Sequence, residues 1–179
     1  MALAVKVVTG EAILAHPYIF NPRSESAEID PGKYTGMVII KKSDKETITK
    51  LKSAVDSAIK SQWPDKAPGG LSMPIKDGDA KFAEDEKKYP HLQGTVYLNA
   101  KTTTKPKVFD AKVEEILDPT EVTSGDYAKV SLNFKAFDKA GNKGVGVYLN
   151  AVQMLRKGPV VIGGGNAKDD FHAENDDVF

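Results

Sequence analysis

The sequence contains no cysteine, and this absence excludes several kinds of site. Without thiols the chain forms no disulfide, holds no zinc–thiolate centre and has no cysteine nucleophile. Long apolar runs are also missing, since nothing approaches the roughly 20 residues of a membrane span. The N-terminal segment MALAVKVVTG has neither the apolar length nor the flanks of a signal peptide. We therefore expect a cytoplasmic protein that makes no contact with a membrane.

Signatures of catalysis are missing as well. The three histidines, His16, His91 and His172, are scattered, and no two have the spacing of metal ligands. There is no Gly-x-Ser-x-Gly motif and no phosphate-binding loop, and the run of glycines that begins at Gly163 is not followed by Lys-Ser or Lys-Thr. These absences predict a protein that is not an enzyme and that has no cofactor and no metal site.

One acidic cluster in the body leaves a minor alternative open. Asp77 and Asp79 are followed closely by acids at positions 84–86. Such a cluster is compatible with a divalent ion and hence with a metal-dependent nuclease. However, the spacing of a calcium-binding EF-hand loop is absent, and we favour a solvated turn.

Arginine is scarce, and the charges are unevenly distributed along the chain. The formal net charge is 0, yet the segment from Gly163 onward holds five acids and one base. The body before it therefore carries 24 bases against 20 acids. Only Arg23 and Arg156 are arginines. Lysine acts as a point charge, whereas arginine reads bases and phosphates with two hydrogen bonds. A lysine-rich body is typical of attraction to a nucleic-acid backbone and not of sequence reading.

The hydrophobic pattern predicts a mainly β fold with one helix. Residues 44–62 have helical spacing, with Ser43 as the expected N-cap and Glu46 completing a capping box. Several short segments alternate between apolar and polar residues and are separated by turn residues, which favours an antiparallel barrel of five strands. Strand segments, five or more in number, are expected within residues 3–20, 34–42, 93–101, 107–117, 126–138 and 144–156, with residues 64–91 as a long insertion.

Three of the predicted strands place aromatic rings on the polar face. Single-stranded nucleic acid needs a basic groove and exposed rings on which bases stack. Tyr97 and Phe137 share their faces with lysines, and Tyr148 lies on the polar side of the last strand. The alternative is a purely structural role, in which these rings cover the sheet or pack under a loop. The candidate binding residues, with lysines of the nearby loops included, are Tyr97, Asn99, Lys101, Lys105, Lys107, Lys135, Phe137, Lys143 and Tyr148.

The C-terminal segment 163–179 is acidic, follows three glycines and should be disordered. It nevertheless contains Phe171 and ends in Phe179. Carboxylates beside an aromatic ring imitate phosphates beside a base. We therefore expect this tail to compete for the basic groove of the body, residues 1–162, or to bind partner proteins. An inert solubilising tail is the alternative.

The order of several segments resembles the single-stranded DNA-binding proteins of tailed bacteriophages. The similarity covers nearly the whole chain and ends on the acidic tail that closes with Phe179. The segments that carry it are Tyr34–Ile59, Pro74–Asp79, Tyr97–Ala100, Lys105–Pro106, Gly125–Asn133, Lys139–Gly144 and Leu149–Gln153.

This resemblance implies an OB-fold with a helix between strands and non-specific binding of single-stranded DNA. It also implies a role in phage DNA replication, recombination and repair inside the host cytoplasm. The tail of such proteins contacts replication partners such as a polymerase or helicase and can occlude the DNA groove. The resemblance implies that this role falls on Asp176, Asp177 and Phe179. A homodimer remains open, and so does the alternative that the barrel is an interaction or scaffold module without DNA binding.

Overall fold

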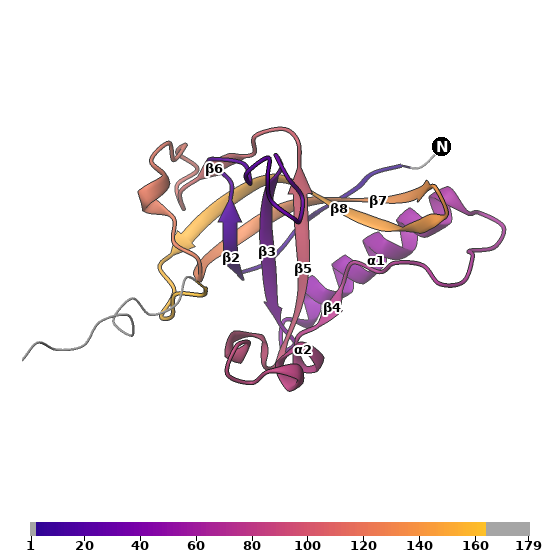
Figure 1. Ribbon diagram of the computed structural model, residues 1–179, viewed down its shortest axis with the longest axis horizontal. Coiled ribbons are helices and arrows are strands. Elements are labelled where there is room, and N and C mark those ends of the chain that lie inside the picture. Colours follow the sequence, from indigo (N-terminus) through magenta and orange to yellow (C-terminus); the bar gives the residue numbers. More distant parts are fainter. Residues whose placement is uncertain (1–2, 164–179) are drawn as a thin grey trace, which may run out of the picture.

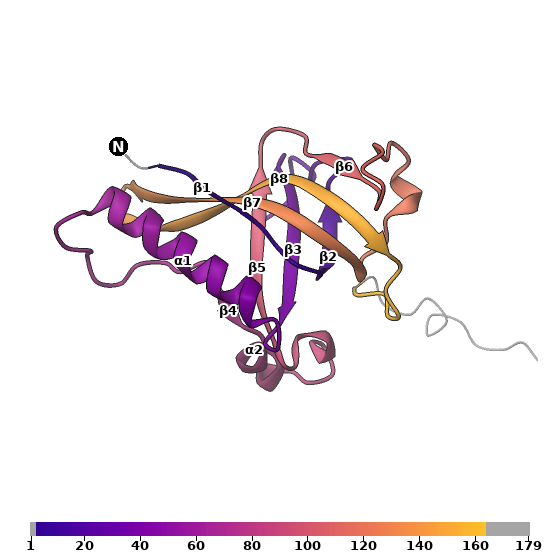
Figure 2. The same cartoon turned by 180° about the vertical axis from the view of Figure 1, so that it is seen from behind.

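The computed structural model describes residues 3–163, which form a mainly β structure with two α-helices (Figures 1 and 2). The helices are α1 (Lys45–Gln62) and α2 (Gly78–Glu84), and the 3-10 turns are η1 (Pro90–Leu92) and η2 (Pro119–Glu121). The strands are β1 (Val5–Val8), β2 (Ala12–Tyr18), β3 (Tyr34–Lys41), β4 (Lys76–Asp77), β5 (Thr95–Thr102), β6 (Lys107–Phe109), β7 (Asp126–Lys139) and β8 (Asn142–Arg156).

Five of the strands pair in a closed circuit. β7 pairs with β2, β2 with β3, β3 with β5, β5 with β8, and β8 returns to β7. All of these pairings are antiparallel except β5–β8, which is parallel and rests on the single register pair Lys101 and Tyr148. The circuit confirms the expected five-stranded barrel with a helix between two of its strands. The parallel closure departs from the expected antiparallel pattern, and so does the parallel pairing of β6 with β8 outside the circuit.

Alternation along the strands explains the interior of the barrel. On β7 every second side chain from Ala128 to Ala136 is buried, and the residues between them face outward. Phe134 is the largest fully buried side chain of the core. Burial of a residue of this size contributes roughly 2–3 kcal/mol of hydrophobic free energy.

Helix α1 begins one residue later than its capping box predicts. The carboxylate of Asp44, and not the hydroxyl of Ser43, accepts the Thr47 N–H at 3.2 Å, so Asp44 is the N-cap. The helix ends at Gln62, as expected. It lies along β1 and the β7–β8 hairpin (Figure 2) and packs on the barrel with the buried side chains Thr47, Leu51, Ala54, Val55 and Ala58.

The strand expected over residues 107–117 ends early. β6 stops at Phe109 because the Asp110 carboxylate accepts the backbone N–H groups of Lys112 and Glu114, at 2.8 and 2.9 Å. This local turn competes with the extended strand. Val113 accordingly has a positive φ of 65°. The insertion 64–91 also holds more structure than expected, namely β4, α2 and part of η1.

Within residues 3–163, no helix is both long and apolar enough to cross a bilayer. The predicted tail residues Phe171, Asp176, Asp177 and Phe179 lie outside the described residues. The predicted disorder of this segment therefore stays a prediction.

Candidate nucleic-acid interface

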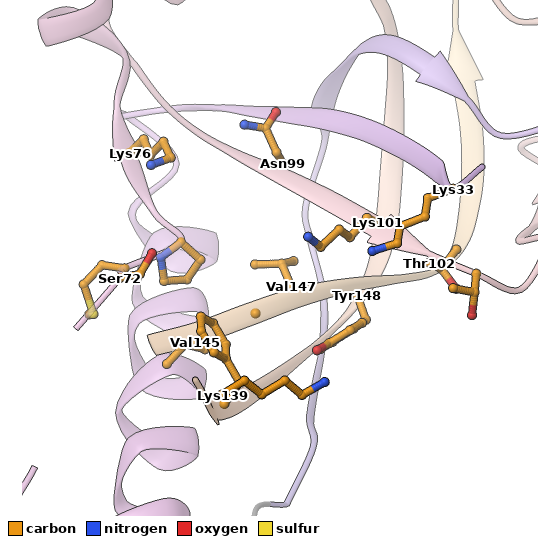
Figure 3. A pocket seen from close by; sticks show the side chains of 15 residues that line it. Lys33, Ser72, Lys76, Asn99, Lys101, Thr102, Lys139, Val145, Val147 and Tyr148 are labelled. Carbon is orange, nitrogen blue, oxygen red and sulfur yellow. The ribbon is translucent and has the colours of Figure 1, made fainter. Parts of the chain in front are cut away.

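A groove opens where the barrel is most weakly closed. β5 and β8 meet at Lys101 and Tyr148 and then diverge. The segment 72–77 spans the gap, because Ser72 bridges to Gly144 of β8 and β4 pairs with β5. The resulting groove has a volume of about 600 Å³ (Figure 3). Its walls thus come from four parts of the chain that are distant in sequence, since Lys33 also lines it.

The contact between Ser72 and β8 depends on a glycine. The Ser72 N–H donates to the Lys143 carbonyl at 2.9 Å, and the Val145 N–H donates to the Ser72 carbonyl at 3.0 Å. A Cβ at Gly144 would overlap that carbonyl oxygen of Ser72. Gly144 therefore allows the segment to dock on the edge of β8, and this docking forms one wall of the groove.

The groove is lined by four lysines, and none of its described lining residues is acidic. Lys101 forms an ion pair with Asp30, with 3.1 Å between Nζ and Oδ1. Within the part of the chain that the structure describes, Lys33, Lys76 and Lys139 have no carboxylate partner. Unpaired lysines around a concave surface attract phosphates, and their field extends over a Debye length of about 8–10 Å.

Two aromatic rings accompany these lysines on the hairpin side. Tyr148 is 39 % exposed, and an added Cβ at Gly146 would lie 3.2 Å from its Oη. The ring thus lies over Gly146, where a larger residue would displace it. Phe137 is half-buried and is paired with Gly144 on the neighbouring strand. Figure 3 shows Tyr148 and Lys139 on this side of the groove, with Lys33 and Lys101 on another.

The groove brings together four of the nine candidate residues, namely Asn99, Lys101, Phe137 and Tyr148. The other lysines do not line it. Lys105, Lys107 and Lys135 are exposed outside the groove, and Lys143 forms an ion pair with Asp138 at 3.8 Å.

The expectation that Tyr97 presents its ring to solvent is wrong. Tyr97 is only 8 % exposed and belongs to a second buried cluster with Ile39, Leu92 and Ile162. It does lie on the outer face of β5, but η1 and the end of the described chain cover that face. Alternation identified the face of the strand correctly and did not show what covers it.

Several lining residues were not expected from the sequence because they come from loops or from the short strand β4. Lys33 precedes β3, Lys76 belongs to β4, and the remaining ones lie in an insertion or at the end of β5. The sequence signal in this region is weak: an apolar Met73 stands beside Pro74 and close to Lys76. The missed residues are Lys33, Ser72, Met73, Pro74, Lys76, Thr102 and Thr103.

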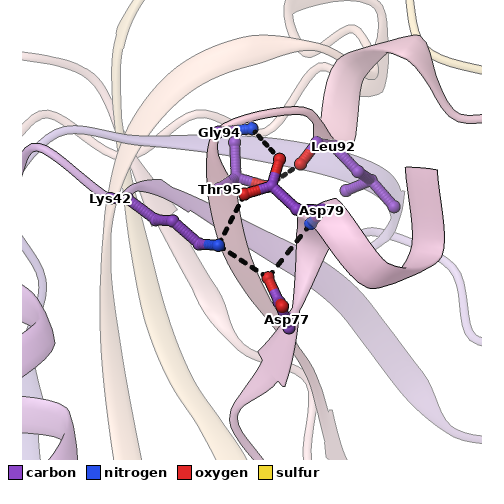
Figure 4. A network of polar contacts seen from close by, with 6 residues as sticks. All are labelled: Lys42, Asp77, Asp79, Leu92, Gly94 and Thr95. Atoms are coloured by element: carbon purple, nitrogen blue, oxygen red, sulfur yellow. Dashed lines mark hydrogen bonds and ion pairs between the residues drawn. The ribbon is translucent and has the colours of Figure 1, made fainter. Parts of the chain in front are cut away.

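The acidic pair Asp77 and Asp79 lies in the expected solvated turn, where both carboxylates are exposed and form an ion-pair network with Lys42 (Figure 4). The Lys42 ammonium lies 2.8 Å from Asp77 and 2.5 Å from Asp79. Asp79 also accepts the Gly94 N–H at 2.7 Å. Lys42 lowers the pKa of Asp77, and the Gly94 N–H followed by Lys42 lowers the pKa of Asp79. Both carboxylates therefore hold α2 and β4 against the barrel.

Within residues 3–163, no group of three or more acids and histidines gathers at a spacing suited to a metal ion. The nuclease alternative therefore gains no support from this network.

A family model matches almost the whole chain. The model describes the single-stranded DNA-binding protein of Enterobacter phage Enc34 and matches residues 5–179. The chain belongs to this family. The family is one of DNA-binding proteins, and its membership confirms the resemblance read from the sequence. A comparison with the curated proteins finds no match.

Solved structures of phage proteins have the same fold as this member of the Enc34 family. The single-stranded DNA-binding protein of bacteriophage Enc34 is 20 % identical, with a TM-score of 0.71 over 92 % of this chain and 89 % of that one. Its complex with single-stranded DNA gives a TM-score of 0.73 at 20 % identity, over 88 % and 89 % of the two chains. The single-stranded DNA-binding protein gp2.5 of bacteriophage T7 is 17 % identical, with a TM-score of 0.61 over 97 % of both chains.

Proposed function

We propose that this protein binds single-stranded DNA, with little sequence preference, in the groove between β5, β8 and the segment 72–77. The observation that carries this proposal is the combination of unpaired lysines and two accessible rings in one concave surface. Family membership supports the ligand class, and the relative of known structure from phage Enc34 was solved with single-stranded DNA.

The lining residues suggest how such a strand is held. Lys33 and Lys101 attract phosphates from one side, and Lys76 and Lys139 attract them from the others. Bases stack on Tyr148 and Phe137, and each stacked base contributes about 1–3 kcal/mol. Stacking and point charges act on every base alike, so this arrangement favours coverage of any exposed strand.

Such binding suits a role in phage DNA replication, recombination and repair, where single strands are exposed. In this proposal residues 1–162 form the binding domain and residues 163–179 form a regulatory tail. The tail competes for the groove through Asp176, Asp177 and Phe179 and recruits a polymerase or helicase when DNA displaces it. The charge difference between the body and the tail supports this division.

The double charge reversal Lys76→Glu/Lys139→Glu tests the groove. Fluorescence anisotropy with a labelled oligothymidylate should show affinity at least about tenfold weaker at low salt. The log–log salt slope should also become less steep by about 1.4, because two phosphate contacts of about 0.7 each are lost. The matched control Lys45→Glu/Lys52→Glu makes the same charge change on α1, outside the groove. Equal weakening by the two pairs would show that the groove is not the binding site.

Deletion of residues 166–179 tests the tail. The truncated protein should bind the same oligonucleotide more tightly at low salt, and the difference should shrink as salt screens the charges. Equal affinities at low salt would contradict the competition.

A further inference from the structure

A second pocket lies at the point where the described chain ends. It has a volume of about 360 Å³ and shares no lining residue with the groove. Its walls are largely apolar, with Val160 and Val161 left 64 % and 66 % exposed. Tyr127 and Pro90 contribute further flat surfaces. An apolar pocket of this size is large enough to take an aromatic side chain.

Two lysines stand at the rim of this pocket. Lys87 and Lys88 are exposed and, within residues 3–163, have no carboxylate partner for their ammonium groups. Lys88 Nζ lies 5.2 Å from the ring centroid of Tyr89. None of the described lining residues is acidic. The pocket therefore fits an aromatic residue that has carboxylates beside it.

We propose that Phe171 of the same chain occupies this pocket, with Asp169 and Asp170 against Lys87 and Lys88. These three tail residues lie outside the described residues, but Gly163, to which the tail is attached, is described. Gly163 itself lines the pocket, and Phe171 follows it by eight residues. Such a tether spans at most about 27 Å. A short tether gives an effective concentration in the millimolar range.

The length of the tether also distinguishes Phe171 from Phe179 as the occupant of this pocket. Tyr127 at the pocket and Lys139 at the groove are twelve residues apart on β7, which corresponds to about 40 Å. Measured along the strand, this length exceeds the tether of Phe171 but not that of Phe179, which lies sixteen residues beyond Gly163. The longer tether also lowers the effective concentration of Phe179 at the pocket by about threefold. Docking of Phe171 leaves only eight residues before Phe179 and so shortens the reach of the tail into the groove.

Disulfide trapping in the full-length chain tests this docking. The chain has no cysteine, so an introduced pair reacts without background. The pair Lys88→Cys/Asp170→Cys should form an intramolecular disulfide, in the absence of DNA, at least about tenfold faster than Lys129→Cys/Asp170→Cys. Lys129 is an exposed lysine two residues from Tyr127 that does not line the pocket. Rates are measured by mass spectrometry after mild oxidation.

Variants of the tail and the pocket test whether docking of Phe171 causes fast disulfide formation between positions 88 and 170. Adding Phe171→Ser or Val160→Asp should remove most of the tenfold difference, and adding Phe179→Ser should leave it unchanged. Val160 is exposed, so its replacement is compatible with folding. Equal rates for the two cysteine pairs, or no effect of Phe171→Ser, would overturn the proposal. A disulfide that is mainly intermolecular would also overturn docking within one chain. Because no DNA is present, none of these results depends on the proposed DNA binding.

Discussion

The two ends of the outer face of β5 differ although the strand pattern is the same along both. At the closed end, Tyr97 is buried under η1 with Leu92 and Ile162. At the open end, Asn99 and Lys101 face the groove. Nothing in the alternation of residues distinguishes the two ends. The cover at one end and the gap at the other come from segments that are distant in sequence, and these segments decide which end is able to bind a ligand.

The largest expected effect is a loss of folding stability when Tyr97 is truncated at the closed end. Tyr97→Ala should lower the free energy of unfolding by about 3–4 kcal/mol, because it leaves a cavity in a buried cluster. For a chain of this size that corresponds to a loss of roughly 6–16 °C in Tm. Asn99→Ala on the same face at the open end should change stability by less than about 0.5 kcal/mol. Chemical denaturation of both variants measures the difference, and similar losses would contradict the comparison.

The intermediate effect is on DNA affinity and tests whether the open end binds the strand. Tyr148 and Tyr18 are both 39 % exposed, but only Tyr148 lines the groove. Tyr148→Ala should weaken binding of single-stranded DNA by about fivefold or more, because a stacking surface is lost. Phe137→Ala should weaken it several-fold without unfolding the protein. Tyr18→Ala should leave the affinity unchanged in the same anisotropy titration. Unchanged affinity for folded Tyr148→Ala and Phe137→Ala would remove both rings from the proposed interface.

The smallest expected effect is a pH dependence of the closed end. Burial and, secondarily, a neighbouring charge lower the pKa of His16 and of His91 below the usual 6.5. The unfolded chain therefore binds protons more readily. The contribution of the two neutral histidines to stability is complete above about pH 6.5 and is lost as pH falls from that value through their lowered pKa in the folded protein. His16→Asn/His91→Gln should flatten the decrease in Tm between pH 7 and pH 5. Asparagine tolerates the positive φ of 48° at position 16. An unchanged pH profile would show that other groups carry the dependence.

Much of the fold and part of the interface were predictable from local pattern. Periodicity placed α1 and the long strands, and the split between a lysine-rich body and an acidic tail indicated the ligand class. Asn99, Lys101, Phe137 and Tyr148 were identified from their strand faces. The cap at Asp44 and the turn at Asp110 were missed, because competing side-chain hydrogen bonds of similar strength decide such sites.

What the sequence alone determined is the direction in which each strand residue points, since side chains alternate with a period of two. What only the tertiary structure decided is whether an outward side chain is covered. Ring burial at Tyr97 depends on η1, and the groove depends on Ser72 docking beside Gly144. Contacts between segments that are distant along the chain leave no periodic signal in the sequence, and for this reason the groove and the second pocket appeared only in three dimensions.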